Sequence, residues 1–149
     1  MGLVASKVLF DGGVPSLAEI AAAVERRTGL HCRIAADSNG FITVRCREFF
    51  TDIDLRLEGR VVSLEQPIAA SVYFFDELRE ALVDLGGQRC NLGATPLPDA
   101  NVPTTPVRWR DRKWTLRAMD RHPVLTSLLW MAIVVPEAIY RRLFSARRR

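Results

Sequence analysis

The sequence has few of the residues from which metal and redox sites are built. Its 149 residues include three cysteines and two histidines. Cys32, Cys46 and Cys90 are widely spaced and no two of them form a C-x-x-C pair, so we expect neither a zinc framework nor a thioredoxin-like redox motif. Cys32 and Cys46 fall on apolar positions of expected strands, where small buried thiols are the simpler interpretation.

The motifs of catalytic sites are missing as well. The glycine pairs at positions 12–13 and 86–87 lack the spacing and the lysine of a phosphate-binding loop, and no serine stands in a nucleophile elbow. Asp52 and Asp54 share one face of an expected strand, where carboxylates are usually just solvated. We therefore expect a protein that is not an enzyme, with no catalytic residue, cofactor or metal. A small enzyme that uses the charged face of its sheet is the least favoured alternative.

Charge is divided unevenly along the chain. Residues 1–105 contain 10 Lys and Arg against 14 Asp and Glu, a net charge of −4, whereas residues 106–149 contain 11 against 3, a net charge of +8. An acidic body with a basic tail places the positive charge where it can act locally on a partner. No basic region precedes an apolar stretch at the N-terminus, so we expect no secretory signal and a cytoplasmic location.

The spacing of apolar residues predicts an α+β body over residues 1–87. Ser16 and Glu19 form a capping-box pattern and Gly29 supplies a C-cap, which predicts a helix from about Leu17 to Thr28. The pattern then changes to strict alternation, which is typical of antiparallel strands with one buried face. These strands are expected over about 32–36, 42–47, 52–58 and 62–65, with a further strand over 68–75 and an edge strand or ordered arm over 7–10.

A second helix is expected from Glu77 to about Leu85, with Asp76 as its N-cap and two glycines at its end. Two helices on one face of a four- to five-stranded antiparallel meander give a two-layer α+β sandwich. The opposite face of the sheet is expected to be mainly solvated, with a partner-binding surface as the alternative. Its charged side chains are Arg33, Arg45, Arg47, Asp54, Arg56 and Glu58.

A Pro-rich linker over residues 88–106 is expected to connect the body to the tail. Four prolines and few charges predict an extended, semi-stiff segment that crosses a surface. We therefore expect the body to fold when residues 106–149 are deleted. The linker prolines are Pro96, Pro98, Pro103 and Pro106.

The tail, residues 107–149, begins with arginines interleaved with Trp109 and Trp114. This pattern suits a membrane interface, where indoles lie at headgroup depth, and it also suits nucleic acid, where arginine neutralises phosphate. The alternative is that both tryptophans pack back onto the body. The basic residues of the tail are Arg108, Arg110, Arg112, Lys113, Arg117, Arg121, Arg141, Arg142, Arg147, Arg148 and Arg149.

The longest apolar stretch covers residues 123–140 and contains one charge, Glu137. As a helix it would extend about 27 Å, slightly less than a hydrocarbon core of about 30 Å, and Pro136 would kink it. A kinked tail anchor or an interfacial helix competes with a helix buried against the body or a partner subunit. The expected docking residues are Trp109, Trp114, Leu125, Leu128, Leu129, Trp130, Ile133, Val134, Ile139 and Tyr140.

Together these features favour a non-enzymatic interaction or adaptor module. Its C-terminal segment would dock it to a larger protein assembly or to a membrane surface, as a peripheral or tail-anchored protein of the inner membrane. A nucleic-acid-binding protein that uses the basic tail is one alternative, and a toxin-neutralising, immunity-type protein is another. We expect a protein partner or a homo-oligomer, with a membrane surface or nucleic acid as further partners, and no small-molecule substrate.

Overall fold

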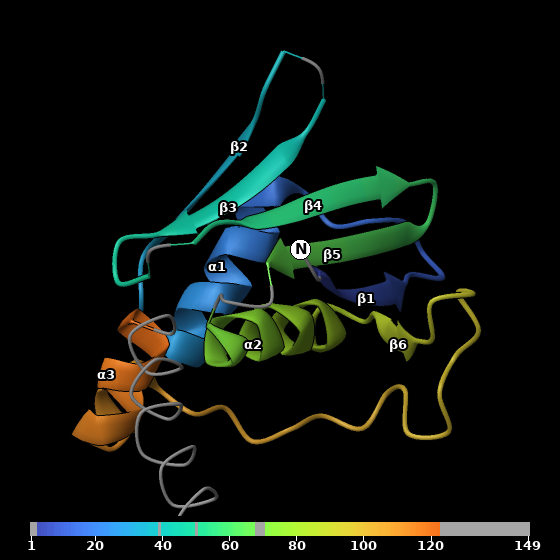
Figure 1. Cartoon of the computed structure of the whole chain (residues 1–149). Coiled ribbons are helices and arrows are strands. Elements are labelled where there is room, and N and C mark those ends of the chain that lie inside the picture. The colour runs from blue at the N-terminus through green and yellow to red at the C-terminus, as the bar shows by residue number, and fades with distance from the viewer. Residues whose placement is uncertain (1–2, 39, 50, 68–70, 123–149) are drawn as a thin grey trace, which may run out of the picture.

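The fold is an antiparallel sheet with helices packed on one face. The computed structural model describes residues 3–38, 40–49, 51–67 and 71–122 (Figure 1). Within these ranges all strands join one sheet in the order β2-β3-β4-β5-β1-β6, with antiparallel pairing throughout. The predicted α+β class is thus confirmed. The elements are β1 (Leu3–Leu9), α1 (Leu17–Thr28), β2 (Cys32–Ala36), β3 (Ile42–Cys46), β4 (Ile53–Glu58), β5 (Val61–Pro67), α2 (Val72–Asp84), β6 (Gln88–Cys90), η1 (Trp109–Asp111) and α3 (Trp114–Arg121).

The sheet has six strands rather than the expected four or five. Strands β2 to β5 form the predicted meander, whereas β1 is inserted between β5 and β6 (Figure 1). On the core face, Val8 of β1 lies opposite Val62 of β5, and both side chains are completely buried. The N-terminal strand is therefore an interior strand and not an edge strand. Its partners are distant in the sequence, so the alternation of residues could not reveal them.

Helix α1 has the bounds and both caps that the sequence predicts. The Glu19 carboxylate accepts hydrogen bonds from the backbone N–H and the hydroxyl of Ser16, at 2.8 and 2.7 Å, and the Glu19 N–H donates to Ser16 Oγ at 3.3 Å. Gly29 ends the helix with a φ of 69°, a left-handed conformation that a side chain disfavours. Ile20 and Val24 point into the core and are fully buried, so α1 covers one part of the sheet.

Helix α2 begins earlier than predicted. Its N-cap is Ser71, whose hydroxyl accepts a hydrogen bond from the Phe74 N–H at 3.3 Å, so Asp76 lies inside the helix. The predicted strand over 68–75 is wrong from Val72 onward, and residues 68–70 lie outside the described residues. The aromatic run from Tyr73 to Phe75 favours a strand by propensity, but in the helix all three rings are buried, and this packing outweighs the propensity.

Gly87 allows the chain to turn closely from α2 into β6. A Cβ atom at this position would come within 2.4 Å of Val8 Cγ1 and 2.8 Å of the Leu82 carbonyl oxygen. Contacts this short are not accommodated without movement of the backbone, so the space between α2 and β1 fits only glycine.

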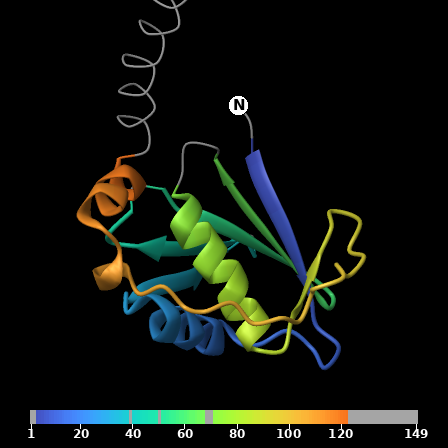
Figure 2. The ribbon, with the colours of Figure 1, turned by 90° about the horizontal axis from the view of Figure 1, so that it is seen from below.

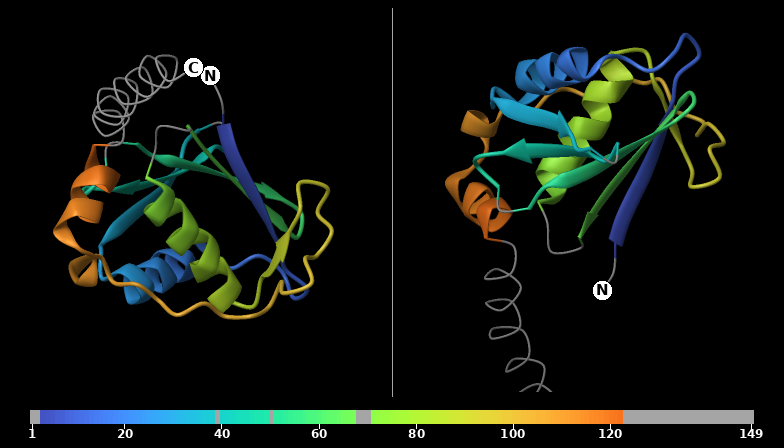
Figure 3. Two further views of the ribbon diagram at one scale, coloured as in Figure 1. Left: turned by 60° about the horizontal axis from the view of Figure 1, so that its bottom comes forward. Right: turned by 90° about the horizontal axis from the view of Figure 1, so that it is seen from above.

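The core lies between the sheet and the two long helices, with α1 and α2 on the same side of the sheet (Figure 3). Cys32 and Cys46 belong to it and lie directly opposite each other on β2 and β3, so their prediction as buried thiols is confirmed. The hydrogen bond with Cys32, together with burial, raises the pKa of the Cys46 thiol. Cys46 therefore stays protonated, and its Sγ donates to the Glu48 carboxylate at 2.9 Å.

Candidate functional site

The chain after β6 runs along the outer side of α1 and α2 before it reaches α3 (Figures 2 and 3). Arg27 of α1, which is only 2% exposed, holds it there. The Arg27 Nε donates to Glu77 and one terminal nitrogen donates to Asp84, both at 2.8 Å, while the other donates to Thr104 Oγ1 at 3.0 Å. The predicted linker over residues 88–106 thus begins as strand β6, which the sequence did not indicate, and a buried guanidinium binds its later part to the surface of α1 and α2.

A second buried ion pair meets the same threonine. The Glu80 carboxylate accepts hydrogen bonds from Arg89 Nε and from Thr104 Oγ1, each at 2.8 Å. Burial disfavours the charged form of Glu80, but the hydrogen bonds from Arg89, Thr104 and Arg79 outweigh it and lower the pKa of Glu80 to about 2. Because the acceptors and donors satisfy one another, this network fixes the chain in place.

Trp109 is part of the hydrophobic core and not of an exposed docking surface. Its indole is 4% exposed and lies with its ring centre 5.0 Å from that of Phe49 and 5.5 Å from that of Tyr73. The Tyr73 hydroxyl donates to the Val107 carbonyl oxygen at 2.6 Å, which holds the chain just before the indole. The first tryptophan of the tail therefore packs back onto the body.

Arg112 attaches α3 to the start of α2. Its guanidinium carbon lies 4.4 Å from the centre of the Tyr73 ring, and its Nη2 donates to Asp120 at 2.8 Å. The other Asp120 oxygen accepts from the Ser71 hydroxyl at 3.3 Å. Burial raises the pKa of Asp120, although Arg112 and Ser71 act in the opposite direction. Arg112 was predicted as one of the basic residues of the tail, and in the structure it attaches α3 to the body.

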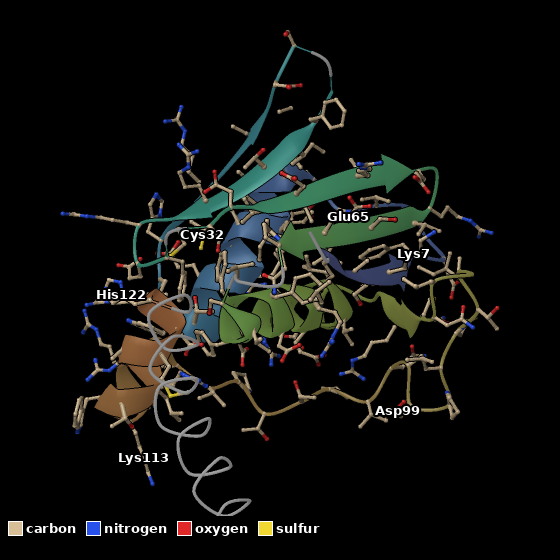
Figure 4. All side chains as sticks on the ribbon, viewed as in Figure 1. Lys7, Cys32, Glu65, Asp99, Lys113 and His122 are labelled. Atoms are coloured by element: carbon tan, nitrogen blue, oxygen red, sulfur yellow. The ribbon has the colours of Figure 1, made fainter. Side chains whose placement is uncertain are left out.

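The remaining side of α3 faces outward and combines aromatic, apolar and basic groups. Trp114 is 74% exposed, and Leu116 and Met119 are each 39% exposed. No residue of α3 is buried, so its contacts to the body are those of Asp120 and its neighbours. Figure 4 marks Lys113 and His122 at the two ends of the helix, with Lys113 pointing away from the body. The other described basic residues of the tail that are exposed or half-buried are Arg108, Arg110, Arg117 and Arg121.

Two depressions meet at the C-terminal end of α3. One, of about 330 Å³, is lined by Trp114, Arg117, Ala118, Arg121 and His122. The other, of about 470 Å³, is lined by Arg121 and His122 together with two residues from the turn after β3. Of these two residues, Arg47 was expected on the charged outer face of the sheet and Glu48 was not predicted as a site residue, since only the folded chain brings the turn after β3 to the end of α3.

The charged outer face of the sheet carries two ion pairs among its own residues. Arg45 donates to both oxygens of Asp52, with distances from 2.5 to 3.0 Å, and Arg56 pairs with Glu65 at 3.3 Å. Asp52 is thus engaged with Arg45 and does not form a carboxylate pair with Asp54. These cross-strand ion pairs agree with the interpretation of this face as mainly solvated.

The other predicted docking and basic residues lie outside the described residues, and so does the apolar stretch over 123–140. Among the residues that the structure describes, no helix has the length and apolar character to cross a membrane. In the same ranges no His, Cys, Asp and Glu side chains gather in a group suited to a metal ion. The predicted docking and basic residues that lie outside the described ranges are Leu125, Leu128, Leu129, Trp130, Ile133, Val134, Ile139, Tyr140, Arg141, Arg142, Arg147, Arg148 and Arg149.

Fold and site define an α+β protein whose basic, tryptophan-bearing helix α3 is attached to its body by Arg112 and Asp120. No protein-family model, curated protein or solved structure matches the chain. The function therefore has to be argued from the surface of α3 and from the sequence that follows it.

Proposed function

We propose that this chain is a non-enzymatic interaction module held at an anionic membrane surface by α3 and the apolar sequence after it. The observation that carries the proposal is the outer side of α3. The indole of Trp114 is 74% exposed beside Arg117 and Arg121, and the apolar stretch begins two residues after the helix ends.

Each part of this surface has a known preference for the membrane interface. Exposed indoles favour the headgroup region, where one edge contacts lipid and the N–H remains hydrated. Each arginine near an anionic leaflet contributes about 1 kcal/mol of attraction, which decays within a Debye length. Residues 123–140 supply 18 mostly apolar positions that would be costly to leave in water.

The burial of Trp109 favours lipid over nucleic acid as the partner. Single-stranded nucleic acid is usually bound by several aromatic rings on which successive bases stack. Of the two tryptophans interleaved with arginine, only Trp114 is exposed, because Trp109 is buried against Phe49 and Tyr73. A single indole at the border of a basic surface fits the edge of a bilayer better than a stacking platform.

The attachment of α3 to the body would give the membrane-bound segment, α3 and the apolar sequence after it, a defined direction. The ion pair between Arg112 and Asp120 and the burial of Trp109 hold α3 at one end of the body. A helix fixed in this way would transmit the orientation of the anchored segment to the whole body, so that a protein partner meets the same surface each time.

The test is co-flotation of the full-length protein with lipid vesicles. We expect it to float with phosphatidylcholine vesicles that contain anionic lipid, more weakly at high salt, and more weakly still as the Trp114→Ala variant. Phe41→Ala is the matched control, because Phe41 is also an exposed aromatic residue (52%) but lies in the turn between β2 and β3. A protein that stays in the soluble fraction and instead binds single-stranded nucleic acid would replace this proposal with the nucleic-acid alternative.

A further inference from the structure

The larger depression at the end of α3 brings together groups from distant parts of the chain. Its lining consists of Arg47 and Glu48, from the turn after β3, and Arg121 and His122, from the end of α3. The smaller depression shares Arg121 and His122 and adds Arg117. Two guanidinium groups, those of Arg47 and Arg121, therefore line the larger hollow together with a single carboxylate, and that of Arg117 lines the adjoining one.

These three guanidinium groups belong, with those of Arg26, Arg33, Arg60, Arg108 and Arg110, to the described arginines that lack an internal ion pair. Arg47, Arg117 and Arg121 form no ion pair with a carboxylate among the residues that the structure describes. Guanidinium groups left without an internal anion can bind an external one, and their fork of N–H donors matches the oxygens of a phosphate group. By contrast, the arginines that pair with a carboxylate are Arg27, Arg45, Arg56, Arg79, Arg89 and Arg112.

The side chain of Arg121 is held in place by a contact within the protein. Its guanidinium carbon lies 5.8 Å from the centre of the Trp109 ring, which is itself buried. The cation–π contact orients the side chain at the border of the core, and a group oriented in advance loses less freedom on binding. Arg121 thus supplies a preformed wall of the hollow.

Glu48 gives the site a second chemical preference. Its Oε2 accepts the Cys46 thiol, but a carboxylate has two oxygens with lone pairs, so Oε1 can accept a further hydrogen bond. In a lipid headgroup a hydroxyl or an ammonium group can donate that bond. An ammonium group cancels the negative charge of the phosphate, whereas a hydroxyl leaves that charge for the arginines to bind. The wall therefore favours a ligand that carries a phosphate and free hydroxyl groups.

We propose that this hollow, formed by Arg47, Glu48 and Arg121, binds the headgroup of an anionic lipid that joins a phosphodiester to a free polyol, as in phosphatidylglycerol. The inference rests on the proposed function, because the adjacent Trp114 and the apolar sequence make lipid the source of the phosphate. The guanidinium groups of Arg47 and Arg121 bind the phosphate, and Glu48 accepts a hydroxyl of the glycerol.

A competition experiment tests this proposal. Full-length protein is offered two vesicle populations of equal charge, one with phosphatidylglycerol and one with phosphatidylmethanol, whose phosphodiester has the same charge but no free hydroxyl. We expect about a fivefold preference for phosphatidylglycerol, the factor that one hydrogen bond of ordinary strength provides. Glu48→Gln keeps an acceptor for the Cys46 thiol but removes the charged acceptor for the glycerol hydroxyl, so the preference should fall towards one. Thermal unfolding of each variant checks that it is folded.

The arginines are tested in the same assay. Arg47→Gln should weaken binding to phosphatidylglycerol vesicles about fivefold. Arg33→Gln, which removes the same charge from an exposed position on β2, should weaken it much less. Equal effects of the two variants would show diffuse attraction and overturn the site.

The remaining outcomes distinguish the proposed headgroup site from the proposed attachment to the membrane. Binding to both vesicle types without preference in the wild type would overturn the site but support attachment to the membrane. If the protein bound no vesicles, yet bound soluble glycerol 1-phosphate in a manner lost in Arg47→Gln, the lipid assignment and the proposed function would both be wrong.

Discussion

Thr104 is the residue at which two buried ion pairs meet. Its hydroxyl accepts from Arg27 and donates to Glu80, so one side chain joins α1, α2 and the chain that crosses them. Thr104→Val keeps the shape but leaves a buried donor and acceptor without this partner. We expect the free energy of unfolding in urea to fall by about 1–3 kcal/mol. Thr105→Val is the control, because Thr105 is exposed as Thr104 is but forms no side-chain hydrogen bond with the described residues, and a loss of the same size there would refute the role of Thr104.

The depressed pKa of Glu80 makes one contribution to stability depend on pH. Its pKa is about 2 in the folded protein against an ordinary value of 4.5, so the folded state binds this proton less tightly than the unfolded state. The stabilisation is thus present above about pH 4.5 and is lost as the pH falls towards 2. The difference in unfolding free energy between wild type and Glu80→Gln should shrink over this range. A difference that stays constant from pH 7 to the acid limit would contradict this assignment.

Gly87 is a residue whose replacement has a purely steric effect. In Gly87→Ala the new methyl group would collide with Val8 and with the backbone oxygen of Leu82, and the latter cannot rotate away. We expect a loss of about 1–3 kcal/mol, measured by thermal or urea unfolding. Gly12→Ala is the matched control, since a Cβ atom there meets nothing within 4 Å. Equal stability of the two variants would show that α2 and β1 can move apart.

At the scale of elements, α3 is a helix of eight residues without a buried side chain. A helix this short is not stable alone in water, so it depends on its attachment to the body. Its firmest link is the ion pair between Arg112 and Asp120 at 2.8 Å. We therefore expect Asp120→Asn to speed hydrogen exchange of the α3 amides and to leave exchange in α2 and the sheet unchanged.

The control for this prediction is Asp111→Asn, which removes the same charge from an exposed aspartate of η1. Exchange in α3 should remain slow in that variant. If both variants behaved alike, the helix would be held by its general charge environment and not by the specific pair with Arg112.

Across the whole molecule, the features predicted correctly were those encoded by neighbouring residues. The capping box of Ser16 and Glu19 and the glycine after Thr28 define α1 locally, and the alternation of residues defines the meander. The start of α2 was missed because the aromatic run after Ser71 has strand propensity, and only its burial selects the helix. The position of Trp109 and the approach of Arg47 to Arg121 depend on tertiary contacts, which no local pattern reports.

The same tertiary contacts change what is expected of a truncated chain. From the sequence, residues 1–105 should fold by themselves, but this segment lacks Trp109, which fills the space beside Phe49 and Tyr73. Removing a buried indole costs about 3–5 kcal/mol, a large part of the stability of a small domain. A chain of residues 1–122 keeps Trp109, Arg112 and all of α3. We expect it to unfold cooperatively in urea, with a higher midpoint than residues 1–105.

This pair of truncations also separates the fold from its attachment to membranes. Residues 1–122 retain Trp114 and the arginines of α3 but lack the apolar stretch. Because electrostatic attraction then acts without the burial of apolar residues, vesicle binding should become weak and be lost completely at high salt, whereas the full-length protein should lose only part of its binding there. Equally tight, salt-resistant binding by residues 1–122 would assign the whole affinity to α3, and the apolar stretch would then have to be covered by protein.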